Sequence, residues 1–176
     1  MKAMKTDKLK KLSACHEAIE WVATQKDYET AWQNCERGDW MLWLAKKLNV
    51  DDRKLTLAKF KCANQVRHLL KDQRSIDALD AAEKYGNGEA GIEALNTAAD
   101  AAYDAAEDAP SAYASAAASA DASVAAYAAL ATAEAAYATA AYAIAEAAYA
   151  ASLKKSADFC REVLTDDVLT AYRELK

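Results

Sequence analysis

VAAYAALATAEAAYATAAYAIAEAAYAA, residues 124 to 151, decides the fold class of this chain. Alanine has the highest intrinsic helix propensity because its side chain loses almost no entropy in a helix. It accounts for 46 of the 176 residues, whereas the chain holds only four Gly and one Pro. A β-sandwich or barrel needs turn residues at each hairpin and β-branched residues between them. The sequence therefore predicts an all-α fold and excludes all-β and α/β architectures.

The alanine-rich stretch is small or apolar on almost every side of a helix. Its polar positions form one narrow strip, Thr132, Thr139 and Glu146. A helix of this kind is normally enclosed by other helices, and small side chains let helix axes approach closely. We therefore expect a compact multi-helix bundle with a long alanine-rich helix at its centre. Whether that helix is broken near Asp121 stays open.

The chain has the length of one domain, residues 1 to 176. Gly86-Asn87-Gly88 is its clearest internal boundary, because glycines of this kind close helices. We expect residues 1 to 88 to form short tryptophan-rich helices. Residues 89 to 176 should form acidic helices rich in Ala and Tyr, followed by a closing helix.

Apolar residues at helical spacing predict the individual helices. Their approximate ranges are 6–24, 27–35, 39–48, 51–71, 72–85 and 89–108, with either Asp72 or Ser75 as the start of the fifth. Gly38 is expected to end one helix and Asp39 to cap the next. Near the end of the chain, Thr165-Asp166-Asp167 predicts the cap of a final short helix. The four tryptophans lie on apolar helix faces and predict a dense aromatic core: Trp21, Trp32, Trp40 and Trp43.

Charge is distributed unevenly along the chain, whose net charge is −5. Residues 1 to 84 carry 17 Lys and Arg against 13 Asp and Glu, whereas residues 85 to 153 carry nine acidic residues and no Lys or Arg. Such a segment repels nucleic acid, so we expect no nucleic-acid partner. The acidic residues also interrupt the alanine tract, and alanine contributes little to membrane insertion, which argues against a membrane span.

The N-terminus and the cysteines indicate a cytoplasmic protein. The first residues are basic but lack the apolar core and cleavage site of a signal peptide. The four cysteines contain no C-x-x-C pair, which is typical of reduced and mostly buried thiols: Cys15, Cys35, Cys62 and Cys160.

The sequence offers few groups for catalysis or for metal binding. The only histidines are His16 and His68, and neither has metal-ligand spacing to a cysteine. A Cys–His nucleophile would also need an oxyanion hole, for which there is no signal. The chain contains no glycine-rich phosphate loop, nucleophile elbow or H-E-x-x-H pair. We therefore expect no enzyme activity, cofactor or metal.

The expected helix 89–108 carries the best candidate for a binding site. Five carboxylates fall on one of its faces without an intervening cation: Glu93, Asp100, Asp104, Glu107 and Asp108. An ordinary solvated face would have the same pattern. As a functional surface, this ladder of carboxylates would bind a basic protein partner through complementary charge.

Four blocks of the sequence resemble a family of α-helical immunity proteins. The blocks are SACHEAIEWV, AWQNCERGDWMLWLAKKL, DDRKLTLAKFKCANQVRHLL and RSIDALDAAEKYGNGEA, and ERGDWMLWLA is the most specific part. The family is encoded in bacterial polymorphic-toxin loci, and similar sequences occur in phages and prophages. The resemblance covers nearly the whole chain and implies a cytoplasmic inhibitor that binds a toxin without catalysis or a cofactor. It transfers no functional residues.

Three functional hypotheses follow from the sequence. The first is an immunity protein that neutralises a toxin by binding it through the acidic helix. The second is a phage-encoded antagonist or sponge, whose Tyr/Ala helix lines a groove for a host defence protein or a small molecule. The third is a self-associating module, because alanine seams also join the subunits of homo-oligomers.

Overall fold

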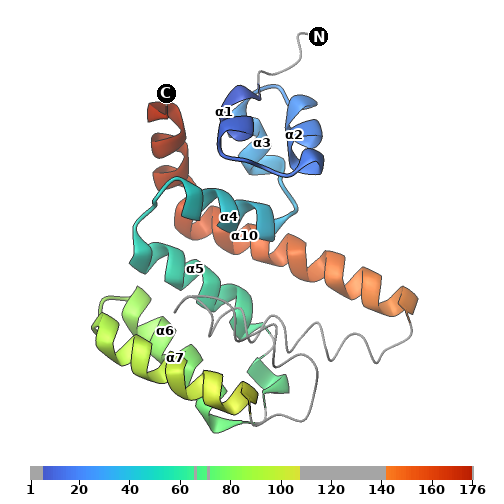
Figure 1. Cartoon of the computed structure of the whole chain (residues 1–176). Helices are drawn as coiled ribbons and strands as arrows, with labels where there is room; N and C mark the ends of the chain where they lie inside the picture. Colours follow the sequence, from blue (N-terminus) through green and yellow to red (C-terminus); the bar gives the residue numbers. More distant parts are fainter. Residues whose placement is uncertain (1–5, 66, 71, 108–141, 176) are drawn as a thin grey trace. The chain divides into compact units, whose positions relative to one another are not determined.

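The computed structural model describes residues 6–65, 67–70, 72–107 and 142–175 (Figure 1). These ranges contain helices and no strand, which confirms the predicted all-α fold. The helices are α1 (Asp7–Lys11), α2 (His16–Ala23), α3 (Tyr28–Asn34), α4 (Gly38–Lys47), α5 (Asp52–Asn64), the 3-10 turn η1 (Arg67–Leu69), α6 (Gln73–Gly86), α7 (Ile92–Glu107) and α10 (Tyr142–Glu174). Most of the alanine-rich stretch, with the expected break near Asp121, lies outside the described residues.

The chain divides into two compact units. The first comprises residues 1–51 and 153–176, and the second comprises residues 52–152. Both sides of the Gly86-Asn87-Gly88 boundary, α6 and α7, therefore belong to the same unit. The expectation of one domain over residues 1 to 176 stays a prediction.

In the first unit, residues 6–24 form two helices, so the single helix predicted there was wrong. Ser13 adopts a left-handed φ of 63°, a conformation that a helix interior excludes. The backbone N–H of Ala14 donates back to the carbonyl of Leu9 at 3.0 Å, which closes α1. Cys15 is then extended and precedes α2. The apolar residues keep their helical spacing on both sides of the break at Ser13, which is why the sequence pattern predicted a single helix.

Gly38 begins α4 instead of ending the helix before it, and Asp39 lies in the first turn of α4 instead of capping it. Asp39 pairs with Arg37, whose Nε and Nη2 donate to the two carboxylate oxygens at 2.9 and 2.6 Å. A Cβ at position 38 would lie 2.5 Å from the Cβ of Ser156 and 2.8 Å from the backbone nitrogen of Ala157. Glycine is thus required here by the close approach of α10, and helix termination is not its role.

Only one of the four tryptophans is a core residue. Trp32 is 4% exposed, and its Nε1 donates to the Thr165 hydroxyl at 2.9 Å. Trp21, Trp40 and Trp43 are half-buried. The prediction of a dense core of all four was therefore wrong for these three.

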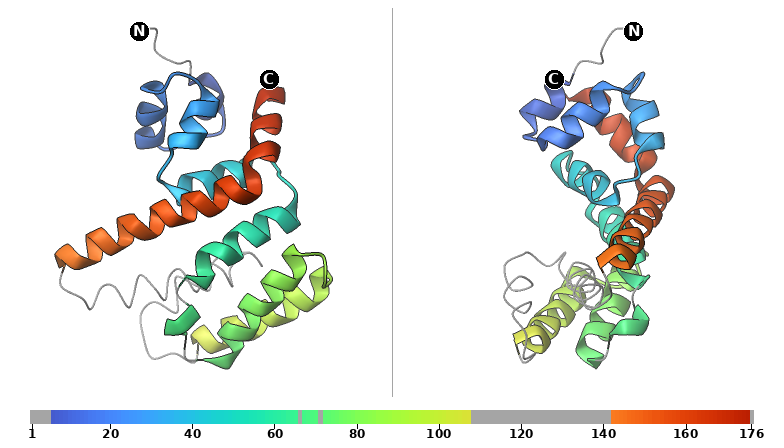
Figure 2. Two further views of the ribbon diagram at one scale, coloured as in Figure 1. Left: turned by 180° about the vertical axis from the view of Figure 1, so that it is seen from behind. Right: turned by 90° about the vertical axis from the view of Figure 1, so that its right-hand side faces the viewer.

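The cap predicted at Thr165-Asp166-Asp167 was also wrong, because α10 runs through these residues without interruption. The Thr165 hydroxyl donates to the carbonyl of Arg161, one turn earlier, at 2.6 Å. A threonine bonded in this way stays inside a helix and often bends it. Figures 1 and 2 show α10 changing direction towards its C-terminal end.

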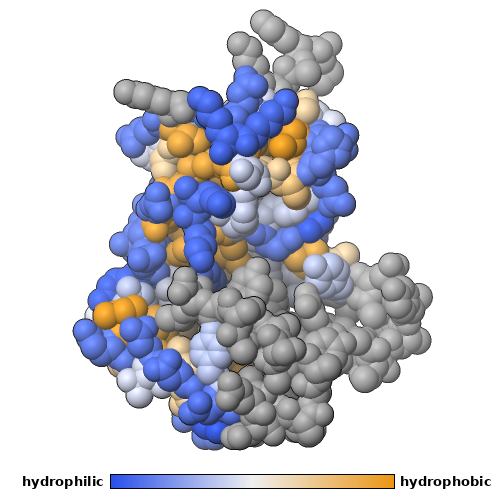
Figure 3. Space-filling model, in the orientation of Figure 1, coloured by the Kyte–Doolittle hydropathy of each residue, from blue (hydrophilic) through white to orange (hydrophobic). Residues whose placement is uncertain are grey.

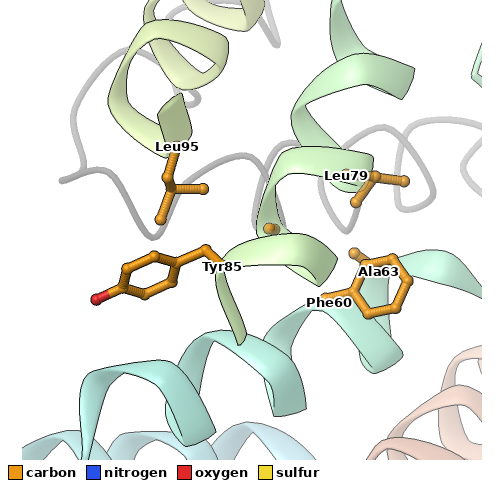
Figure 4. Close-up of a cluster of buried hydrophobic side chains, with 6 residues drawn as sticks. Phe60, Ala63, Leu79, Tyr85 and Leu95 are labelled. Atoms are coloured by element: carbon orange, nitrogen blue, oxygen red, sulfur yellow. The ribbon is translucent and has the colours of Figure 1, made fainter. Parts of the chain in front are cut away.

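In the second unit, α6 packs against both α5 and α7. The core between these helices combines aromatic, aliphatic and alanine side chains (Figure 4): Phe60, Ala63, Leu79, Ala82, Tyr85 and Leu95. Asp72 caps α6 by accepting from the backbone N–H of Arg74 at 2.9 Å, one of the two positions at which the sequence predicted the start of this helix. The prediction of one helix over 51–71 was wrong, since α5 ends at Asn64 and the 3-10 turn η1 follows.

Replacing Gly38 with Ala should lower the free energy of unfolding by about 1 to 3 kcal/mol, because the added methyl group meets the backbone of α10. Gly91→Ala is the matched control, since its Cβ would meet only the flexible end of the Glu93 side chain. Urea denaturation of both variants measures the difference. Equal losses in the two variants would contradict the close crossing of α4 and α10.

Acid should weaken the ion pair between Arg67 and Asp80. The Nη1 atom of Arg67 lies 2.5 Å from Oδ1 of Asp80. The hydrogen bond from Arg67 lowers the pKa of Asp80 in the folded state. Because an unfolded Asp titrates near about pH 4, this stabilisation is complete above that pH and is lost as the pH falls through the lower folded pKa.

Asp80→Asn should therefore reduce the free energy of unfolding at pH 7, and the loss should shrink at about pH 3 and below. Urea denaturation at both pH values measures it, with Asp100→Asn on the exposed side of α7 as the control. A loss that stays the same at both pH values would show that the Asp80 carboxylate is not stabilised by Arg67.

Candidate partner-binding face

The inner side of α7 is fixed by burial against α6. Leu95, Ala99 and Ala102 are 3 to 6% exposed and follow one another at spacings of four and three, the period of one helix face. Ala102 joins Ala78 of α6 in a second small cluster. Small side chains along this seam let the two helices lie close together. The opposite side of α7 is therefore held towards solvent.

The turn that leads into α7 is fixed by Arg53 of α5. Its Nη1 donates to the carbonyls of Tyr85 at 2.6 Å and Ala90 at 3.1 Å. The guanidinium also lies 4.5 Å from the centre of the Tyr85 ring, within the range of a cation–π contact. The start of α7 is thus connected to α5 as well as to α6. The predicted helix began at about residue 89, and this turn delays its start to Ile92.

Three of the five predicted site residues are brought together on the outer side of α7. Glu93, Asp100 and Asp104 are exposed, and Thr97 lies between them on the same side. Glu107 belongs to α7, but its side chain is not among those described. Asp108 lies outside the described residues. We call Glu93, Asp100 and Asp104 the acidic face of α7.

In the described part of the chain, no lysine or arginine forms an ion pair with the acidic face. Other carboxylates on the same unit do have such partners: Asp80 pairs with Arg67, and Asp72 pairs with Arg74 at 2.9 Å. An unneutralised row of like charges produces a negative potential that attracts a cationic surface over about one Debye length, roughly 8 Å at physiological salt. The acidic face therefore presents unneutralised negative charge to solvent, whereas the charges of Asp80 and Asp72 are compensated within the fold.

Ile92 adds an exposed apolar group next to Glu93, at the start of α7. Its spacing of three from Leu95 fits the buried seam, but its exposed fraction is 43%. It occupies the first position of α7, directly after the turn held by Arg53. An exposed isoleucine next to charged residues is a common arrangement at protein interfaces, where an apolar anchor has a polar rim. Sequence spacing alone could not reveal this exposure, because residue 92 lies three positions before Leu95 and so fits the helical period of the buried seam.

Histidine and cysteine side chains do not converge on a reactive centre. His16 is 82% exposed and lies 3.0 Å from Glu20 on the same helix, and His68 is exposed in η1. Cys35, Cys62 and Cys160 are buried and Cys15 is exposed; burial raises the pKa of the Cys35 thiol, which disfavours the reactive thiolate. Within the described ranges, no three His, Cys, Asp or Glu side chains are grouped to hold a metal ion.

None of the described helices combines the length and the apolar character that crossing a membrane requires. Comparison with known protein families, with curated proteins and with solved structures finds no match to this chain. The resemblance to α-helical immunity proteins therefore stays a prediction from the sequence blocks.

Truncating Ile92 should leave stability almost unchanged, whereas truncating its neighbour on the seam should not. Ile92→Ala is expected to change the free energy of unfolding by less than about 0.5 kcal/mol, because the side chain is exposed. Leu95→Ala should cost about 2 to 5 kcal/mol, because it empties a buried site. Thermal and urea denaturation compare the two variants, and a large loss from Ile92→Ala would place that side chain in the core.

Proposed function

We propose that this protein is an immunity-type inhibitor, which neutralises a basic toxin by binding it through the acidic face of α7. The observation that carries the proposal is the exposed row Glu93, Asp100 and Asp104, for which no described cation serves as a partner. The sequence blocks that resemble immunity proteins support the same function. Binding alone would inhibit the toxin, so no catalytic group or cofactor is required of this chain.

The geometry of α7 suits a rigid inhibitor. Eleven residues separate Glu93 from Asp104, and at 1.5 Å per residue the acidic face extends over about 16 Å. Because α7 is fixed by its seam and by Arg53, the carboxylates lose little freedom when a partner binds. Toxins that act on nucleic acid are cationic where they contact phosphates. A rigid row of carboxylates could occupy that surface and exclude the substrate.

Charge and apolar contact contribute differently to such a complex. Exposed ion pairs at an interface contribute only about 0.2 to 1 kcal/mol each, and they act mainly on the association rate. Ile92, exposed beside Glu93, would supply the apolar contact that slows dissociation. The partner should therefore offer an apolar pocket next to a basic surface.

The alternative function is a phage-encoded antagonist or sponge, acting on a host defence protein or a small molecule. Its groove was assigned to the Tyr/Ala helix, most of which lies outside the described residues. This alternative stays a prediction, as does a cytoplasmic location. A sponge would release its ligand when the purified protein is denatured, and mass spectrometry would detect that ligand.

Reversing two charges on the acidic face should weaken the complex with a toxin encoded next to this protein's gene, because two attractive contacts become repulsive. Asp100→Lys with Asp104→Lys changes exposed residues, so the variant should fold normally while its affinity falls at least about 100-fold. Isothermal titration with a catalytically inactive toxin measures the affinity, and circular dichroism checks the fold.

The matched control changes the net charge equally at another place. Asp166→Lys with Glu174→Lys reverses two exposed acidic residues of α10 and should leave the affinity within about threefold, because α10 is not part of the acidic face. Equal losses of affinity in both double variants would show that the change of net charge, and not its position on the acidic face, weakens the complex. The absence of any complex between the wild-type protein and the toxin at micromolar concentration would refute the toxin-specific function.

A further inference from the structure

Three half-buried tryptophans lie together at the surface of the first unit. Trp21 of α2 and Trp40 of α4 have ring centres 6.2 Å apart, and Trp43 follows Trp40 by one helical turn. We call these three residues the tryptophan ridge. Cations flank its rings: the Arg37 guanidinium lies 4.4 Å from the centre of Trp40, and the Lys47 ammonium lies 5.9 Å from that of Trp43. Tryptophan and arginine are the residue types most enriched where protein interfaces concentrate their binding energy.

The two ends of the ridge carry opposite charges. Glu17 lies one turn before Trp21 on α2; its side chain is 78% exposed, and its Oε2 lies 4.0 Å from Nη1 of Arg37. Arg37 also pairs with Asp39, with 2.6 Å between Nη2 and the carboxylate. One guanidinium thus faces two carboxylates, and this end keeps a net negative charge. The opposite end carries Lys47, exposed in the last turn of α4. The ridge therefore has an acidic end at Glu17 and a basic end at Lys47.

This charge pattern is complementary to itself. A two-fold axis through the ridge would place the Lys47 end of one copy against the Glu17 end of the other, with the tryptophans in contact between them. Such an isologous contact is the commonest kind of homodimer interface. A uniformly basic partner would be repelled at Lys47, and nucleic acid or an anionic membrane would be repelled by the net negative charge at the Glu17 end. The charges thus favour a second copy of this chain over these other occupants.

We propose that the protein forms a two-fold homodimer through the tryptophan ridge, in which Lys47 of each copy pairs with Glu17 of the other. This interface lies on the first unit, whereas the acidic face lies on α7 of the second. The dimer needs no toxin, so it can be tested in the purified protein, and its failure would leave the proposed inhibitor function unaffected.

Sedimentation equilibrium of the purified full-length chain, from about 1 to 200 µM, tests this proposal. The wild-type protein should show the mass of a dimer at the higher concentrations. Lys47→Glu and Glu17→Lys should each weaken the dimer at least about tenfold, because each places like charges together. The double variant, Lys47→Glu with Glu17→Lys, should restore it, since the attraction is regained with reversed signs. This recovery also shows that the single variants fold.

Lys46→Glu is the matched control for Lys47→Glu. It makes the same change of charge in the same last turn of α4, but 100° away around the helix axis, and it should leave the dimer intact. A wild-type protein that stays monomeric at 200 µM would overturn the proposal. So would a dimer that resists Lys47→Glu, a double variant that stays monomeric, or a Lys46→Glu variant that dissociates equally.

Discussion

The close crossing of α4 and α10 at Gly38 is the contact on which the first unit depends. No side chain fits between the two helices there, because a Cβ on residue 38 would lie 2.5 Å from that of Ser156. Polar contacts on both sides of the crossing fix the same alignment: Lys154 with Glu36 at 2.6 Å, and Arg161 with the carbonyl of Cys35 at 2.7 Å. The first 51 residues therefore obtain a large part of their core from the last 24, although more than 100 residues separate them in sequence.

This dependence explains why α10 is long and uninterrupted. The Thr165 hydroxyl accepts a hydrogen bond from buried Trp32 and donates one to the carbonyl of Arg161. If a new helix began at Thr165, the bond to Arg161 would be lost and the hydroxyl would no longer be held in place for Trp32. Near the end of the same helix, Lys8 of α1 donates to the carbonyl of Tyr172 at 2.8 Å. Burial raises the pKa of the Tyr172 phenol above its ordinary value, which reflects how deeply this side chain is packed. Each of the helices α1, α3 and α4 thus has a contact on α10.

Sequence reasoning succeeded where the determining forces are local. Composition gave the all-α class, and Asp27 and Asp72 were correctly expected to start helices because each accepts from a backbone N–H two or three residues later. It failed where a distant segment decides the outcome. Gly38 looks like a helix terminator until α10 is known to lie against it, and Ile92 looks buried until the turn held by Arg53 is known. Exposure of Glu93, Asp100 and Asp104 was predictable because α7 has a regular apolar seam, whereas their lack of partners could be judged only in three dimensions.

The acidic face of α7 and the tryptophan ridge differ in the signs of the charges that they carry. The acidic face of α7 has one sign and suits a different, basic protein, whereas the tryptophan ridge has both signs and suits a second copy. Figure 3 shows hydrophilic and hydrophobic residues interspersed over the described part of the visible face. The two proposed binding surfaces thus lie on different units.

Native-state hydrogen exchange tests most directly whether α10 completes the core of the first unit. Segments that form one cooperative unit open together and share one free energy of opening. The amides of α3, of α4 and of residues 156–172 should therefore lose protection at the same free energy as urea is raised. If residues 156–172 opened at a clearly lower free energy while α4 stayed protected, the α4–α10 crossing would not be the contact that holds this unit together.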